Sequence, residues 1–460
     1  MSAAKLPAAR RIVRFYTALS GKDLPETTRH AVRRHMLDTL GVGIAGAAQP
    51  EPEAVAAACR RLCGGGGGAP LWGARQNVPS FSAALINGAA SHALELDDAS
   101  GCDHSGAVMT PALMAALPLA PHATDDDLIA AFCAGYDLGR RVMEAAGGYD
   151  AHNNAGWHST GTCGVFGASI AVSRLLGVGE DVATNALGIA GSFSSGNWSF
   201  MADGAMTKRL HAGHAAAGGL MSVELARGGL IGPEHVFDTD WGGFFSTYCA
   251  KGDANPELLT ADFGNLWRIH RSSIKPYASC RGTHAAVEIA RRLEPSLPVT
   301  EVERISIHVT ATIHRMCGGY DIRSLVDAQM SLPYAVAVAW LTGEADLSRF
   351  LPPIRGSEAV AEVMRRIEIV ADPSIDNNLA ARVLATRRDG VVVEDRVDVP
   401  EGSWNNPLPD TALIAKYHSL ATPVIGRKGA EALHQRIFAL GGGGLAADIS
   451  PLLTAINVKE

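Results

Sequence analysis

Residues 92–111 hold the densest group of side chains that could transfer protons. Two imidazoles and four carboxylates fall within thirteen residues: His92, Glu95, Asp97, Asp98, Asp103 and His104. Asp, Ser and Gly favour turns over helix interiors, so we expect a loop over 97–105 and a new helix starting near Pro111. A loop this rich in titratable groups, between two apolar helices, suits general acid–base chemistry. A solvated acidic turn is the alternative for the segment taken alone.

Two further segments place an imidazole and an ammonium group near predicted helix ends. Residues 156–161 read GWHSTG, which puts His158 in a small-residue loop just before a helix. A helix N-terminus there favours a bound carboxylate, although a histidine that only caps the helix is equally consistent. Residues 207–214 begin a helix of Ala and Gly, where Lys208 is suited to pairing with an anion. An ordinary exposed lysine is the alternative.

No group of side chains has the sequence spacing of a metal site, and we expect no metal. His211 and His214 lie three residues apart but lack a nearby carboxylate that would complete a facial triad. Glu431 and His434 form a single Glu-x-x-His motif, whereas a di-iron bundle needs two.

Ser272 and Lys275 match Ser-x-x-Lys, the nucleophile motif of penicillin-recognising enzymes. The companion Lys-Thr-Gly motif is absent from the sequence, so a serine hydrolase is the weakest interpretation that we keep. Lys275, which Pro276 and Tyr277 follow, remains a candidate for binding an anion.

Hydrophobic periodicity predicts a helical first part and a mixed second part. Helical patterns cover residues 26–47, 80–96, 124–146, 159–176, 181–193 and 207–227. After Trp267 the pattern changes to strands over 304–310, 381–387 and 391–399, the last two joined by the hairpin turn Asp389-Gly390. Helices are predicted over 328–341, 358–366 and 413–440.

The predicted fold is therefore mainly α. A large all-helical domain is built from both chain ends, residues 1–268 and 408–460, and a smaller α+β lid domain covers residues 269–407. A chain of 460 residues is too long for one simple core and agrees with such a division.

Composition points to a cytoplasmic protein without nucleic-acid or membrane partners. Hydrophobic residues make up 47% of the chain, charged residues 19%, and the net charge of −7 gives no sign of a basic surface. The eight cysteines are scattered, which favours a reducing compartment over a disulfide scaffold. Met1–Arg14 lacks a signal-peptide pattern, and no stretch approaches the roughly 18 apolar residues that span a bilayer.

Five segments, in this order, resemble the MmgE/PrpD family. They are DTLGV at 38–42 with Ala45-Gly46; Asn87-Gly88 with HALELDD at 92–98 and HSG at 104–106; GWHSTG at 156–161; KRLHAG at 208–213; and KPY at 275–277 with His284 downstream. The family includes 2-methylcitrate dehydratase, cis-aconitate decarboxylase and iminodisuccinate epimerase. The resemblance implies a large helical domain with a smaller α+β lid, a homodimer, and no cofactor.

Carried over by position, the resemblance also implies a set of site residues. The catalytic residues would be His104, His158, Lys208, Lys275 and Tyr334, and the substrate-binding residues Asp97, Asp98, Ser159, Thr160 and Cys280. Four features depart from the family pattern. Ala99 stands where the dehydratases and decarboxylases often have Thr, and Ser105-Gly106-Ala107 replaces Pro-Ser-Asp-Asn of the dehydratase. Cys280 stands where the decarboxylase has a further His, and Glu95 where it has Asp.

We therefore expect a cofactor-independent lyase, a dehydratase or decarboxylase, acting on a di- or tricarboxylic acid. Such reactions pass through a carbanion-like species beside a carboxylate, which requires a proton-transfer group and fixed positive charge. Two imidazoles and two lysines from different domains would supply them, with lid closure excluding water. An epimerase of a dicarboxylate using the same site is the alternative, and a non-catalytic binding protein is a further one.

Overall fold

The computed structural model describes residues 6–454, and within it the chain forms two compact units. The first contains the chain up to Ala93, then Asp97–Ser272, then the chain from Asp410 onward. The second contains Leu94–Leu96 and Ser273–Pro409. Among the described residues, no helix is both long and apolar enough to cross a membrane.

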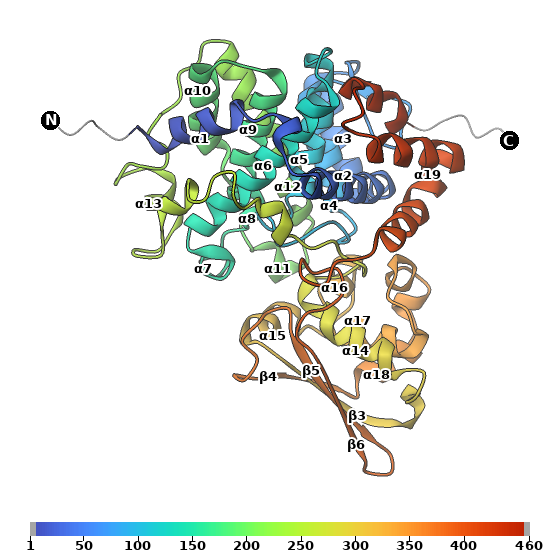
Figure 1. Ribbon diagram of the computed structural model, residues 1–460. Coiled ribbons are helices and arrows are strands. Elements are labelled where there is room, and N and C mark those ends of the chain that lie inside the picture. The colour runs from blue at the N-terminus through green and yellow to red at the C-terminus, as the bar shows by residue number, and fades with distance from the viewer. Residues whose placement is uncertain (1–5, 455–460) are drawn as a thin grey trace. The chain divides into compact units, whose positions relative to one another are not determined.

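The first unit is built mainly from helices (Figure 1). They are α1 (Ala8–Thr17), α2 (Glu26–Gly46), α3 (Pro50–Cys63), α4 (Ser80–His92), α5 (Gly106–Ala116), α6 (Asp125–Ala145), α7 (Gly148–Asn154), α8 (Ser159–Thr162), α9 (Gly164–Leu176), α10 (Glu180–Ala190), α11 (Phe200–Asp203), α12 (Thr207–Arg227), α13 (Phe244–Tyr248) and α19 (Asp410–Phe438). Two short strands, β1 (Ala69–Pro70) and β2 (Asn77–Val78), pair antiparallel and are the exception to an all-helical unit. The prediction of a mainly α fold is confirmed.

Glycines let helices α4 and α12 approach each other closely. A Cβ added at Gly213 would lie 2.2 Å from the carbonyl oxygen of Leu85, and one at Gly88 would lie 2.5 Å from the Cα of Gly213. Helix α12 also packs against α9, whose Gly164–Ser173 segment is buried throughout. The contact between α4 and α12 places the N-terminal turns of α12, which carry Lys208 and His211, beside the end of α4.

The helix expected near Pro111 begins five residues earlier, at Gly106. The carboxylate of Asp98 accepts a hydrogen bond from the Gly106 N–H at 2.9 Å, and this long-range cap sets the start of α5. Pro111 lies inside the helix, where it removes one backbone hydrogen bond without ending it. The predicted start was wrong because the proline was taken for the first helical position.

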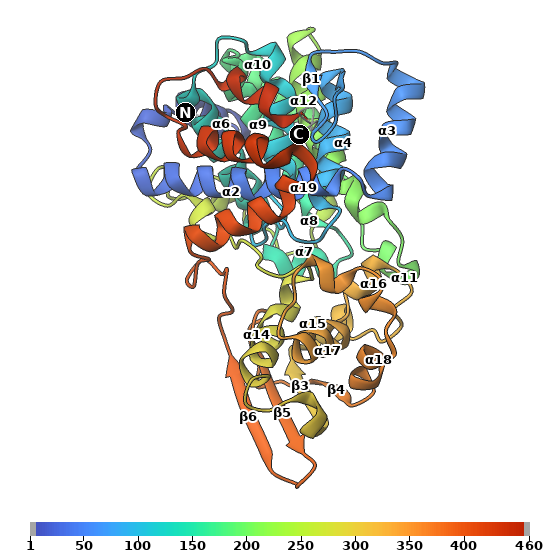
Figure 2. The same cartoon turned by 90° about the vertical axis from the view of Figure 1, so that its right-hand side faces the viewer.

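The second unit contains a four-stranded sheet in the order β4–β3–β5–β6. Strand β3 (Val302–Val309) pairs parallel with β4 (Ile367–Ala371) and antiparallel with β5 (Ala381–Arg387), and β5 forms a hairpin with β6 (Val392–Val397). Burial alternates along β5, so one face of the sheet is covered. Helices α14 (His284–Leu293), α15 (Ala311–Cys317) and α17 (Leu332–Thr342) contact the strands on that side (Figures 1 and 2). Helices α16 (Leu325–Gln329) and α18 (Glu358–Met364) complete the unit.

We expect Gly213→Ala to destabilise the first unit, because the added methyl group would force α12 away from the Leu85 carbonyl. Overpacking of this kind costs about 1–3 kcal/mol of unfolding free energy. Gly139→Ala is the matched control, since that interior glycine of α6 leaves room for a Cβ at 3.4 Å from its nearest neighbour. Urea unfolding of both variants measures the difference, and equal stabilities would contradict the tight contact.

Candidate active site

A buried carboxylate joins two imidazoles at the end of α4. Both carboxylate oxygens of Asp97 lie 3.1 Å from Nδ1 of His92, and Oδ2 lies 2.9 Å from Nδ1 of His104. Nδ1 of His104 is also 2.8 Å from the backbone carbonyl of Asp98. Because both partners of this nitrogen only accept hydrogen bonds, Nδ1 carries a proton. The Nε2 atom of His104 is thereby left facing Asp103.

Asp103 bridges the two imidazoles predicted to be catalytic. Its Oδ2 lies 3.6 Å from Nε2 of His104 and 3.5 Å from Nε2 of His158. All three side chains are almost completely buried. The structure therefore brings His104 and His158, 54 residues apart in the sequence, to one carboxylate.

The loop that carries Asp103 is conformationally strained. Four non-glycine residues among the described ones have a left-handed φ, and three of them lie in this loop: Glu95 (51°), Ser100 (66°) and Asp103 (95°). Each such residue costs of order 1–3 kcal/mol, and strain of this kind gathers at functional sites. At Asp103 the sequence lessens this cost, because Asp enters the left-handed region more readily than most residues.

Helices α8 and α12 supply further polar groups around His158. Nδ1 of His158 lies 2.9 Å from Nδ1 of His211, and Oγ1 of Thr160 lies 3.2 Å from Nε2 of His158. Lys208, in the first turn of α12, places its ammonium 5.9 Å from the ring centre of Trp198. Its charge acts on both Asp103 and His158. One cation thus lies beside the carboxylate and the imidazole.

Electrostatics separate the protonation states of these groups at neutral pH. Burial disfavours ionisation of Asp97, but the imidazoles of His92 and His104 outweigh it and hold the pKa of this carboxyl well below its usual range. Asp103 behaves alike: burial opposes its charge, while His104, His158 and Lys208 lower its pKa. Burial lowers the pKa of His158 to about 4, which Asp103 only partly offsets. Both carboxylates are therefore ionised at neutral pH, and His158 is neutral.

The other predicted residues of the first unit have distinct surroundings. Thr160 contacts both histidines, since its Oγ1 lies 3.2 Å from Nε2 of the His158 ring and accepts the backbone N–H of His104 at 3.4 Å. Ser159 instead accepts from the Asn153 side chain at 3.3 Å. Asp98 accepts from the Tyr136 hydroxyl at 2.5 Å and contacts His35 Nδ1 at 3.0 Å, besides capping α5. This geometry favours a structural role for Asp98.

In the second unit, Lys275 is paired with a carboxylate. Its Nζ donates to Oε1 of Glu95 at 3.1 Å and to the Glu95 carbonyl at 3.0 Å, and both side chains are buried. An ammonium bound in this way is a poor general base, so the serine-hydrolase interpretation gains no support. The backbone N–H of Cys280 donates to the carbonyl of Gln329 at 2.8 Å. The hydroxyl of Tyr334 donates to the Arg349 carbonyl at 2.6 Å.

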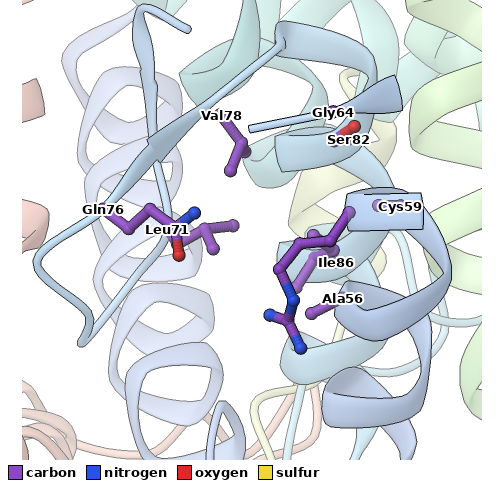
Figure 3. Close-up of a pocket in the computed structure, with 9 residues that line it drawn as sticks. Ala56, Cys59, Gly64, Leu71, Gln76, Val78, Ser82 and Ile86 are labelled. Carbon is purple, nitrogen blue, oxygen red and sulfur yellow. The ribbon is translucent and has the colours of Figure 1, made fainter. Parts of the chain in front are cut away.

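A pocket away from these residues is enclosed by α3, α4 and the β1–β2 turn region and is too narrow for a water molecule (Figure 3). Its lining within the described chain contains none of the predicted site residues. Burial raises the pKa of the Cys59 thiol in that lining, which disfavours its thiolate form.

Three imidazoles of the site also have the spacing of a metal-ligand group. One nitrogen each of His92, His104 and His158 lies within 4.8 Å of the others. Sequence spacing does not show this group, because separate helices bring its members together, and the expectation that no metal binds stays a prediction. His211 and His214 do not form one, since His211 contacts His158 whereas His214 contacts Ser195.

Three residues of this site were not predicted to be functional from the sequence: His92, Asp103 and His211. His92 and Asp103 stand in the focal segment, so their residue types were the available signal. His211 lies one turn after Lys208 on a predicted helix, and that spacing places both on one side of it.

Comparison with known proteins places these residues in a family. The model of the MmgE/PrpD N-terminal domain matches residues 10–257, and that of the MmgE/PrpD C-terminal domain matches residues 277–439. The chain belongs to the MmgE/PrpD family. The resemblance found in five short segments is confirmed.

Relatives of this MmgE/PrpD protein include several decarboxylases. The cis-aconitate decarboxylase-like protein oryM of Aspergillus oryzae is 28% identical over 96% of this chain and 95% of its own length. The cis-aconitate decarboxylase of Aspergillus terreus is 27% identical, covering 99% and 97% of the two chains, and that of Homo sapiens is 27% identical, covering 91% and 89%. The family and these relatives identify an enzyme of the lyase type.

We expect stability to fall between about pH 6.5 and pH 4, with His158 responsible for part of the loss. The folded-state pKa of His158 is about 4, whereas a histidine in an unfolded chain titrates near 6.5. Between these values the unfolded chain binds a proton that the folded protein does not, so acid favours unfolding. The effect of this one residue is about 2 kcal/mol at pH 5. Urea unfolding at pH 7 and pH 5 should show a smaller loss for His158→Asn than for the wild type.

The control for this measurement is His235→Gln, which removes a histidine whose side chain is 66% exposed. That variant should keep the wild-type pH dependence. An identical pH dependence for His158→Asn and the wild type would show that the imidazole is not held neutral by burial.

Proposed function

We propose that this protein is a cofactor-independent lyase that removes CO2 or water from a di- or tricarboxylic acid, with decarboxylation of an unsaturated tricarboxylate as the leading reaction. The observation that carries the proposal is the position of the Asp103 carboxylate between the reactive nitrogens of His104 and His158. The relatives that are cis-aconitate decarboxylases favour decarboxylation over dehydration.

His104 is assigned as the proton donor. Its Nδ1–H is held by Asp97 at 2.9 Å, and Asp103 faces its Nε2 at 3.6 Å. Two ionised carboxylates stabilise positive charge on the ring between them, as expected of a general acid. His92 holds Asp97 from its other side at 3.1 Å and keeps that carboxylate aligned.

His158 acts in its neutral form. Burial lowers its pKa to about 4, so at pH 7 it offers a hydrogen bond rather than a charge. Its Nδ1 is held by His211 at 2.9 Å, which fixes the ring plane. Lys208 then supplies the positive charge that a substrate carboxylate requires, and its influence on Asp103 supports this assignment.

The decarboxylation step needs one proton and no external oxidant. The imidazolium of His104 donates its Nε2 proton to an alkene carbon of the substrate. The bond between the substrate and its departing carboxylate breaks, CO2 leaves, and the electron pair of that bond forms a new carbon–carbon double bond. His104 is left neutral and regains its proton from water, so the substrate has exchanged CO2 for a proton.

The second unit is proposed to be a lid that contributes Lys275. Its ammonium already faces Glu95 at 3.1 Å, so a substrate carboxylate has to share or displace that partner. Glu95 stands where the resembling decarboxylases have Asp, and its longer side chain is a natural determinant of which acid is accepted. The proposed lid covers residues 269–407, and Tyr334 and Cys280 are proposed to contribute to the site from it. The protein is further proposed to be a cytoplasmic homodimer.

Incubation with a panel of polycarboxylates in D2O, followed by NMR, tests the reaction type. We expect an unsaturated tricarboxylate such as cis-aconitate to lose CO2 and to gain one deuterium at the protonated carbon, at an unchanged rate after chelation. Exchange at a carbon beside a carboxylate, without loss of mass, would instead establish an epimerase. No reaction and no exchange with any acid would support the non-catalytic interpretation.

We expect His104→Gln to reduce kcat by roughly 100- to 10,000-fold, because proton transfer by one placed group contributes that much. The glutamine keeps a polar group of similar size, so the urea midpoint should change far less than the rate. His270→Gln is the control, since this half-buried histidine contacts Thr28 at 2.9 Å and no site residue. Wild-type turnover in His104→Gln would refute the assignment.

A further inference from the structure

Helix α19 is broken into two helical halves that lie against each other. Gly426 leaves helical geometry, with φ 75° and ψ 160°, and Pro423 precedes it. Figure 2 shows the change of direction along this helix. The hydroxyl of Tyr417 in the first half donates to the carbonyl of Ala430 in the second at 3.0 Å, which ties the halves together.

Three metal-binding side chains meet across this break. His418 comes from the first half, whereas Glu431 and His434, three residues apart, share one face of the second. Nε2 of His418 lies 3.5 Å from Oε2 of Glu431 and 3.4 Å from Nδ1 of His434. Donor atoms that share a tetrahedral ion at 2.0–2.1 Å are about 3.4 Å apart. The spacing therefore suits one small cation without rearrangement of the helices.

Neighbouring groups hold these ligands in place. Oε1 of Glu431 accepts a hydrogen bond from the Gln435 amide at 2.6 Å, which leaves Oε2 directed at His418. The His434 ring packs edge-on against Phe438, with ring centres 5.2 Å apart. Support of this kind around the first ligands is typical of metal sites.

We propose that His418, Glu431 and His434 bind a divalent transition-metal cation, with Zn²⁺ as the best match. Two imidazoles and one carboxylate suit Zn²⁺, Co²⁺ or Ni²⁺ better than Mg²⁺ or Ca²⁺, which prefer all-oxygen sites. The side chains of His418 and Glu431 are 27% and 50% exposed, so a water molecule can take the fourth position. Bound metal would lock the two halves of α19, and this role is separate from the proposed acid–base chemistry.

Titration of the full-length protein with Zn²⁺ by calorimetry, and with Co²⁺ by visible absorption, tests the site. We expect one site with a dissociation constant on the order of micromolar, a tetrahedral Co²⁺ spectrum, and a higher Tm with Zn²⁺. Glu431→Gln should weaken binding at least tenfold, and this substitution changes only an exposed side chain. His418→Gln should abolish the Tm shift.

Two controls locate the bound ion. His235→Gln, at an exposed histidine, should leave Zn²⁺ binding unchanged. His158→Asn should also leave it unchanged, because the cluster of His92, His104 and His158 is the other group with ligand spacing within residues 6–454. Loss of the tight site in His158→Asn but not in Glu431→Gln would overturn the proposal. The proposal would also be overturned if the wild-type protein bound Zn²⁺ no more tightly than the His418→Gln variant does.

Discussion

Burial of the Asp97 and Asp103 carboxylates is the constraint on which the site depends. An isolated carboxylate transferred to a protein interior is strongly destabilised, so each needs cationic or hydrogen-bonding partners. Asp97 meets this need with His92 and His104, and Asp103 with His104, His158 and the charge of Lys208. The imidazoles cannot move away from these carboxylates without exposing unpaired charge. Their arrangement is thus fixed before any substrate arrives.

The helices around the site satisfy that constraint through close packing. The end of α4 supplies His92 and the start of α12 supplies Lys208 and His211, and these helices approach each other through Gly88 and Gly213. Larger residues at either glycine would separate the two helix ends, and with them His92 from Lys208 and His211. Small residues at this helix contact therefore help to hold the charged groups together, besides filling the core.

Local patterns were sufficient for much of the fold. Helix α12 and strand β5 coincide with their predicted ranges, and the hairpin at Asp389-Gly390 connects β5 and β6. Strand β4 was missed because its alternating residues 367–371 directly follow a helix, and its parallel pairing with β3 is non-local. The start of α5 was misplaced because its cap, Asp98, lies eight residues upstream.

For the site as well, local sequence patterns predicted some features, whereas others depend on long-range contacts. Residue types in residues 92–111 and in GWHSTG identified His104 and His158, since imidazoles among small residues and carboxylates are chemically distinctive. The bridging position of Asp103 and the contact between His158 and His211 depend on helices that meet only in three dimensions. The ligand group of His418, Glu431 and His434 depends on a break at Gly426, which a helical pattern over 413–440 conceals.

The buried carboxylates of Asp97 and Asp103 contact different nitrogens of the imidazoles, and their surroundings suggest different roles. Asp97 contacts Nδ1 atoms, the nitrogens that face away from the reactive side, so it orients rings and need not move. Asp103 faces the Nε2 atoms of both His104 and His158 from a left-handed backbone position. In the proposed reaction an anionic substrate approaches the same two nitrogens, so the Asp103 carboxylate occupies a place suited to a substrate carboxylate. Release of the strain at Asp103 would favour its withdrawal when such a substrate enters, and would offset part of the cost of displacing it.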